Sequence, residues 1–130
     1  MIDAIRSFLE QPRLAYLSTI DLVGYPHTVP VWFAPDGDDL IFSAQKQRVR
    51  LKHIQANSKG AVVIGGNVDD GEGYLLQGKL RIEADTNQAL RHSIVYRYMS
   101  GEAAEQFLTY SNQFENRMVR FTPTKIVKVR

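Results

Sequence analysis

Positive charge is concentrated in one short stretch, residues 46–52, of a sequence whose net charge is only +2. Four cations and one glutamine fall within these seven residues: Lys46, Gln47, Arg48, Arg50 and Lys52. Apolar spacing predicts that a short helix begins here, and the dipole of a helix disfavours cations in its first turn. A phosphate bound by guanidinium groups and by the free N–H groups of the helix start would remove this conflict. A solvated basic helix face is the simpler alternative, and the residues alone leave both open.

A second candidate feature is the proline-containing segment Val29-Pro30-Val31-Trp32. Proline cannot donate a ladder hydrogen bond, so a strand that carries it should lie at a sheet edge or interrupt its pairing there. Unpaired backbone groups beside a flat apolar surface could meet the edge of a flavin-type ring. Alternatively, Pro30 only blunts an edge strand and Trp32 fills the core.

Other kinds of site have weaker support. The sequence has no cysteine, which excludes disulfides, thiol chemistry and cysteine-based metal centres. His27, His53 and His92 are dispersed without the spacing of a metal site, and the acidic loop 67–73 is typical of a solvated turn. Aromatic residues are not interleaved with the basic stretch, which argues against a small barrel that binds nucleic acid. We therefore predict neither a metal site nor a nucleic-acid partner.

The elements that must position these residues are mostly strands. Alternating apolar residues predict strands at 13–20, 27–33, 40–43, 61–64, 74–83, 118–121 and 125–129. Helical spacing predicts helices at 2–9, from about 49 to 58, at 86–99 with Asp85 or Thr86 as its cap, and at 101–110. Strands and helices do not alternate regularly, so we expect a mainly β (α+β by helix content) fold: an antiparallel split β-barrel of six or seven strands with peripheral helices.

Length and composition set the remaining expectations. A chain of 130 residues with 44% hydrophobic content is expected to form a single domain, 1–130. The first residues lack the pattern of a signal peptide, and no stretch approaches the ~18 apolar residues of a membrane span. We therefore expect a cytoplasmic protein that has no membrane partner.

The segment from Pro26 to Asn57 resembles the core signature of the pyridoxamine 5'-phosphate oxidase-like FMN-binding split-barrel family. That family includes deazaflavin-dependent relatives. The matching motifs are a Pro-Val-Trp-Phe strand, an Asp-Gly hairpin and a basic Arg-x-Arg that opens a helix; they lie at 26–33, 36–37, 41–43, 48–50 and 54–57. The resemblance covers about a quarter of the chain densely. Relatives usually have lysine at Arg50, threonine at Ala44 and proline at Ser58.

The resemblance implies a set of cofactor-binding residues. Arg48 and Arg50 would hold the cofactor phosphate, and the loop before them would contribute as well. The full implied set is Val29, Pro30, Val31 and Trp32 along the ring, Ser43 on the ring or ribityl chain, and Lys46, Gln47, Arg48 and Arg50 around the phosphate.

The resemblance also implies a function. We expect an FMN-binding oxidoreductase that acts on a small molecule and forms a homodimer with its cofactor sites at the interface. In such proteins the cofactor performs the chemistry, so no side chain is named as catalytic. Two alternatives stay open: a reductase that uses the deazaflavin coenzyme F-420, and a carrier or sensor that binds flavin or haem without turnover.

Overall fold

The computed structural model describes every residue from 1 to 130 and contains one sheet of seven strands. The strands are β1 (Ala15–Ile20), β2 (Pro26–Val31), β3 (Ala34–Asp36), β4 (Asp39–Gln45), β5 (Lys59–Gly65), β6 (Gly73–Glu83) and β7 (Asn116–Lys128). The helical segments are η1 (Ile2–Ile5), α1 (Arg6–Leu9), α2 (Val49–Ala56), η2 (Thr86–Gln88), α3 (Ala89–Tyr98) and α4 (Gly101–Ser111). None of these helices has the length and apolar character needed to cross a lipid bilayer.

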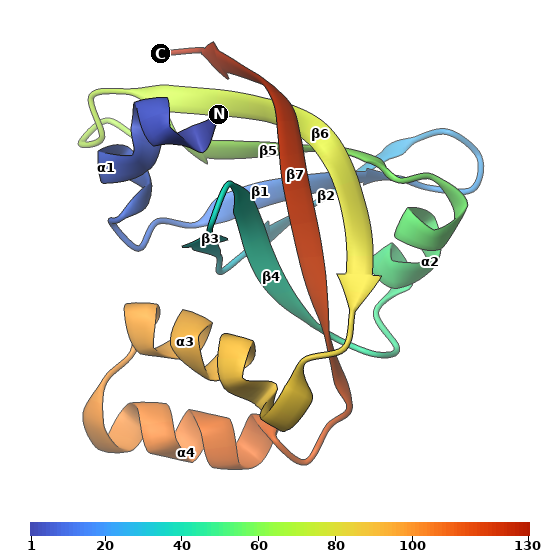
Figure 1. The fold of residues 1–130 in the computed structure, drawn as a ribbon, viewed down its shortest axis with the longest axis vertical. Helices are drawn as coiled ribbons and strands as arrows, with labels where there is room; N and C mark the ends of the chain where they lie inside the picture. The colour runs from blue at the N-terminus through green and yellow to red at the C-terminus, as the bar shows by residue number, and fades with distance from the viewer.

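All neighbouring strands pair in antiparallel fashion, in the order β2-β1-β5-β6-β7-β4-β3. The sheet coils on itself, so that β4 lies in front of β1 and β2 in Figure 1, while the end strands β2 and β3 do not pair with each other. This arrangement is an open barrel. The expected mainly β, antiparallel split-barrel fold is confirmed.

The core fills the inside of this barrel. Its inward residues come from alternate positions of the strands, and Phe33, Phe42 and Phe121 are among the largest that are fully buried. Phe8 and Leu9 of α1 join the same cluster near the N-terminus. Burying one such side chain stabilises the fold by about 1.5–3 kcal/mol, so the strands depend on this shared interior.

The C-terminal strand differs from the prediction of two strands around Pro123, because β7 runs unbroken for 13 residues. Pro123 pairs with Gly78, next to a register shift between Gln77 and Gly78 of β6. A β-bulge tolerates the missing N–H of proline. A Cβ at Gly78 would collide with the backbone of Thr122, so glycine permits this close approach.

Helices α3 and α4 form a hairpin below the strands in Figure 1. The predicted helix at 86–99 begins later, at Ala89, since Asn87 and Gln88 have positive φ angles of 56° and 57°. Asp85 still caps it, accepting hydrogen bonds from the backbone N–H groups of Leu90 (3.1 Å) and Arg91 (2.9 Å).

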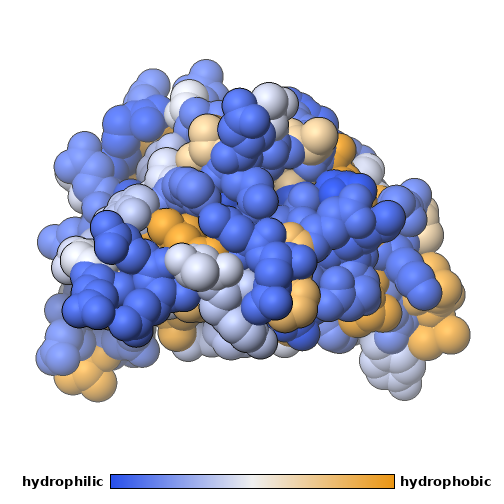
Figure 2. Space-filling view, turned by 90° about the horizontal axis from the view of Figure 1, so that it is seen from below, coloured by the Kyte–Doolittle hydropathy of each residue, from blue (hydrophilic) through white to orange (hydrophobic).

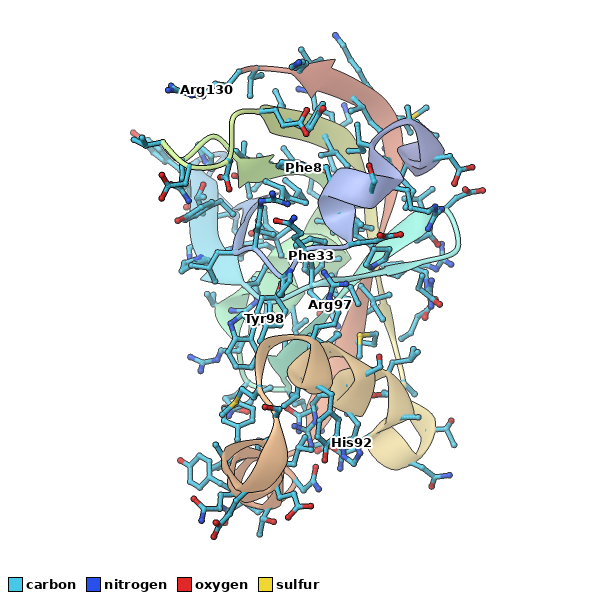
Figure 3. All side chains as sticks on the ribbon, turned by 90° about the vertical axis from the view of Figure 1, so that its left-hand side faces the viewer. Phe8, Phe33, His92, Arg97, Tyr98 and Arg130 are labelled. Carbon is cyan, nitrogen blue, oxygen red and sulfur yellow. The ribbon has the colours of Figure 1, made fainter.

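Two residues at the end of α3 attach the hairpin to the barrel. Arg97 donates from Nε to the Phe33 carbonyl (2.9 Å) and from Nη2 to the Leu9 carbonyl (3.0 Å). The Tyr98 hydroxyl accepts from the Phe33 N–H (3.1 Å) and donates to the Arg13 carbonyl (2.7 Å). Figure 3 shows both side chains directed from α3 toward Phe33 and the barrel. The hairpin is therefore fixed as one wall of the space beside β2 and β4.

Candidate functional site

The space between the barrel and the α3–α4 hairpin contains a pocket of about 380 Å³. Strands β2 and β4, the start of α2, both hairpin helices and the start of β7 supply its walls. Its lining residues are Leu14, Pro30, Val31, Trp32, Ser43, Ala44, Gln45, Arg48, Arg50, Arg91, Ile94, Val95, Phe107, Ser111 and Asn116. Figure 2 views the molecule from the helical end, where apolar residues form separate patches on a largely hydrophilic surface.

The basic end of the pocket is built by the start of α2. Arg48 is the N-cap residue and Arg50 lies in the first turn, which contains no acidic residue and no side-chain cap. No carboxylate oxygen lies within 4.0 Å of either guanidinium group, so neither arginine forms an ion pair. Burial lowers the pKa of the Arg50 side chain, and the charge of Arg48 lowers it further. An anion at this helix start would relieve the repulsion and satisfy the helix dipole.

The apolar wall is built by β2 and its continuation. β2 is an end strand of the sheet, as Pro30 predicted. Trp32 stacks on Tyr98 with ring centroids 4.8 Å apart and planes 5° apart, and its ring also lies 5.6 Å from that of Phe107. These contacts hold Trp32 as a fixed, flat surface.

The floor is built by β4 and β7. Ser43 and Gln45 are half-buried and line the pocket, whereas the intervening Ala44 also belongs to the barrel core. Gln45 pairs with Asn116 of β7, which brings the start of that strand to the pocket. The Asn116 amide donates to the carbonyls of Ser111 (3.2 Å) and Phe114 (2.9 Å), so its position is fixed.

Six of the nine residues predicted to contact a cofactor line this pocket: Pro30, Val31, Trp32, Ser43, Arg48 and Arg50. The other three do not. Val29 packs against the barrel core, since it faces the opposite side of β2 from Pro30. Lys46 forms an ion pair with Glu115 (3.3 Å), and Gln47 donates to the side chain of Gln45 (2.7 Å). The structure thus gathers most of the predicted set around one pocket.

The sequence analysis missed the residues that the hairpin supplies. Arg91, Ile94 and Val95 come from α3, Phe107 and Ser111 from α4. The available signal was the helical spacing of Arg91 with Ile94, Val95 and Tyr98, which places the arginine on the apolar face of its helix.

A second hollow, of about 530 Å³, lies on the outer face of the sheet. We call it the outer hollow; it is lined by Ser18, Ile20, Pro26, Lys59, Gly60, Ala61, Gln77, Gly78, Lys79 and Thr124. It is larger than the first pocket, but it has neither an aromatic wall nor an arginine. It contains none of the residues predicted to bind a cofactor.

Two of the dispersed histidines do meet. The rings of His27 and His53 lie 5.0 Å apart, and the buried His53 shares a hydrogen bond with Thr19 (2.9 Å). No three histidine or acidic side chains are grouped as metal ligands.

Comparison with solved structures places this fold among known proteins. An F420 reductase superposes with a TM-score of 0.75 at 22% identity, covering 94% of each chain. A putative pyridoxamine 5'-phosphate oxidase from Listeria innocua gives 0.74 at 19% identity, covering 98% of this chain and 96% of the other. General Stress Protein 26 from Bacillus anthracis str. Sterne gives 0.70 at 17%, covering 98% and 94%. At these identities the likeness shows the shared fold.

No curated protein matches the sequence. A family model described as pyridoxamine 5'-phosphate oxidase, however, matches the whole chain, residues 1–130. Together with the seven-stranded antiparallel sheet, this match shows that the chain belongs to the pyridoxamine 5'-phosphate oxidase-like split-barrel family.

Proposed function

We propose that the pocket binds FMN and that the protein is a flavin-dependent oxidoreductase acting on a small molecule. The observation that carries the proposal is that Arg48 and Arg50, both without a carboxylate partner, share one pocket with the flat wall around Trp32. Guanidinium forks suit a phosphate, and an apolar planar wall suits a ring system. Three points stay predictions: the site residues, the cytoplasmic location, and the assignment of residues 1–130 to one flavin-binding domain.

Each wall has a role in this proposal. Arg48 and Arg50 hold the phosphate, Pro30, Val31 and Trp32 lie along the ring, and Ser43 contacts the ring or the ribityl chain. A bound flavin supplies the transfer of electrons or hydride. The protein contributes position, because Tyr98 holds Trp32, and it excludes water through the apolar side chains of α3 and α4.

A deazaflavin is the second candidate cofactor, and one observation favours it. The chain superposes on an F420 reductase over 94% of both chains. Coenzyme F-420 carries a longer acidic tail than FMN, which the exposed Lys52 of α2 could meet. A carrier or sensor that binds flavin or haem without turnover is the remaining alternative.

The cofactor is tested by the absorbance spectrum of the purified protein, followed by titration with FMN, riboflavin and coenzyme F-420. Flavin and haem have distinct visible bands. Riboflavin lacks the phosphate, so we expect it to bind about 10–150-fold more weakly than FMN. Equal affinities for FMN and riboflavin would contradict the phosphate assignment, and a haem spectrum would contradict the flavin.

We also propose a homodimer formed through the outer face of the sheet. Cross-strand pairs align Pro30, Tyr16, Val63, Leu75 and Val127 in one apolar row, and Tyr16 is 41% exposed. Pro30 belongs both to this row and to the pocket. A two-fold partner on this row would therefore approach the cofactor site.

Sedimentation tests the dimer. The wild type should sediment at about twice 14.8 kDa, and a Val63→Lys variant should shift toward monomer because it places a charge in the apolar row. Ser7→Lys, at an exposed position of α1, is the matched control. A monomeric wild type at micromolar concentration would rule out the dimer.

A further inference from the structure

The pocket contains a third guanidinium, that of Arg91, which the cofactor proposal does not use. Arg91 lies on α3, directly before His92, which Figure 3 labels. Arg91 is only 3% exposed. Nε donates to the side chain of Gln88 (2.9 Å), Nη1 to the Ser111 hydroxyl (2.5 Å) and Nη2 to the side-chain oxygen of Asn112. All three acceptors are neutral.

No carboxylate forms an ion pair with this buried guanidinium, although the negative charge of nearby Asp85 favours its charged form. Asp85 is the nearest acid along the chain, and its two oxygens accept from the backbone N–H groups of Leu90 and Arg91. The arginines that do form ion pairs are Arg6, Arg13, Arg81, Arg117 and Arg120. Burying an ion without a directly paired counter-ion is costly, which makes Arg91 an exception that needs an explanation.

Attachment to α4 explains part of this arrangement. Ser111 ends α4 and Asn112 caps it, so Arg91 lies at the negative end of that helix dipole, equivalent to about half a charge. A guanidinium has five N–H donors, and Arg91 uses three of them here. Two N–H donors of Arg91 therefore have no acceptor among these residues, and the helix dipole offsets only part of its charge. The same side chain lines the pocket.

The pocket as a whole has the same imbalance. Three of its 15 lining residues are arginines, and none is acidic. A single phosphate carries about −1.5 to −2 charges at neutral pH, less than three guanidinium groups supply.

We infer that Arg91 forms a second anion-binding position in this pocket, separate from the Arg48–Arg50 pair, and that it takes a carboxylate or phosphate group. The group belongs either to the cofactor itself or to a substrate that lies beside it. The inference deepens the proposed function, because it predicts an anionic substrate or a cofactor with a second acidic group.

The decisive experiment removes the first position and leaves the second. In an Arg48→Gln/Arg50→Gln variant, inorganic phosphate should still raise the melting temperature saturably at constant ionic strength, with chloride as the comparison salt. Adding Arg91→Gln should weaken phosphate binding about tenfold or more. Adding Arg81→Gln instead removes an exposed arginine outside the pocket and should leave phosphate binding unchanged.

Absence of a phosphate effect in the double variant would overturn the inference, as would an equal effect with and without Arg91. If Arg91→Gln does not fold, Arg91→Lys serves in its place: the charge remains, so phosphate should still bind, with altered affinity. None of these measurements uses a flavin, so a failure of FMN binding would not be confused with a failure here.

A final titration identifies the source of the anionic group. If FMN-loaded wild type still binds phosphate, Arg91 faces a second ligand. If FMN excludes phosphate, the cofactor itself occupies the position. Loss of FMN affinity on Arg91→Gln, about tenfold or more, should accompany only the second result.

Discussion

Arginine is used in opposite ways at two places in this molecule. Arg120 of β7 is surrounded by three carboxylates, those of Asp36 (2.8 Å), Asp39 (3.3 Å) and Glu83 (3.0 Å). Burial disfavours its charged form, but the hydrogen bonds that it donates to Glu83 and Asp36 outweigh this effect and raise its pKa. In the pocket, by contrast, Arg48, Arg50 and Arg91 form no ion pair with a carboxylate. Burial lowers the pKa of both Arg50 and Arg91, and for Arg91 it outweighs the opposite effect of the nearby Asp85 charge.

The contrast separates arginines that stabilise the fold from arginines that await a ligand. Arg120 joins the β3–β4 hairpin to β6 and β7, and its partners already balance its charge. The pocket arginines form no such ion pairs with other residues of the chain. Substitution should therefore reduce stability at the first place and ligand affinity at the second.

The largest expected effect is at the phosphate position. Arg48→Ala and Arg50→Ala should each weaken FMN binding about 10–150-fold, since each removes a charge-assisted contact. Fluorescence titration of FMN measures this. The matched controls are Lys59→Ala and Lys79→Ala in the outer hollow, which should change the FMN affinity less than twofold. Unchanged affinity in both arginine variants would sink the assignment of this pocket.

Arg120→Met should have the converse effect. It leaves three carboxylates close together with only the exposed Arg81 beside Glu83 and Asp39. We expect the free energy of unfolding to fall by about 2 kcal/mol, less than for a fully buried pair. Urea denaturation measures the loss, while FMN affinity should stay within twofold of wild type. A variant as stable as wild type would show that the two places do not differ as we infer.

A smaller effect is expected from Ser43→Ala, which removes one neutral hydroxyl from the pocket floor. Loss of a single such contact is worth about 0.5–1.5 kcal/mol, or roughly 2–10-fold in FMN affinity. Stability should hardly change, because the side chain is only half-buried. A loss as large as that of Arg48→Ala would mean that the polar floor, rather than the basic end, dominates binding.

The smallest expected effect is on the pH dependence of stability, through Glu83, one of the carboxylate partners of Arg120. Hydrogen bonding by Arg81, and then by Arg120, lowers the pKa of Glu83 below its ordinary 4.5. This carboxylate therefore stabilises the fold above about pH 4.5, and the contribution is lost as the pH falls through its lower folded-state pKa. We expect Glu83→Gln to cost less than about 1 kcal/mol at pH 7, with the difference from wild type disappearing in acid. A difference independent of pH would contradict this origin.

Local patterns were enough to predict most strands and the residues that lie close together in sequence. Alternation located six of the seven strands, and Pro30 indicated an edge strand; the short β3 was missed because Pro35 and Asp36 are typical of a turn. The continuity of β7 could not be predicted, because Pro123 lies at a register shift that depends on pairing with Gly78, 45 positions earlier in the chain. The sequence shows Gly78 and Pro123 separately, but the register shift arises only when β6 and β7 pair.

The pocket was harder still to predict from local patterns, because it too depends on residues far apart in the sequence. Its residues extend from Leu14 to Asn116, and no spacing along the chain encodes their meeting. Helical spacing could place Arg91 on the apolar face of its helix but not in this pocket, because its acceptors Ser111 and Asn112 lie 20 and 21 residues away, at the end of another helix. The basic stretch at 46–52 was visible since a helix start is a local feature, but Lys46 proved to be paired with Glu115.

The stack of Trp32 on Tyr98 has a spectroscopic consequence. Trp32 is the only tryptophan in the sequence, and it forms part of the pocket wall. All indole emission therefore reports from a single location, and a chromophore that enters the pocket should quench it without any label. The near-parallel rings, 4.8 Å apart, also give the indole a rigid chiral environment, so its near-ultraviolet circular dichroism reports whether the α3–α4 hairpin is docked on the barrel. One native residue thus distinguishes an occupied pocket from a detached hairpin.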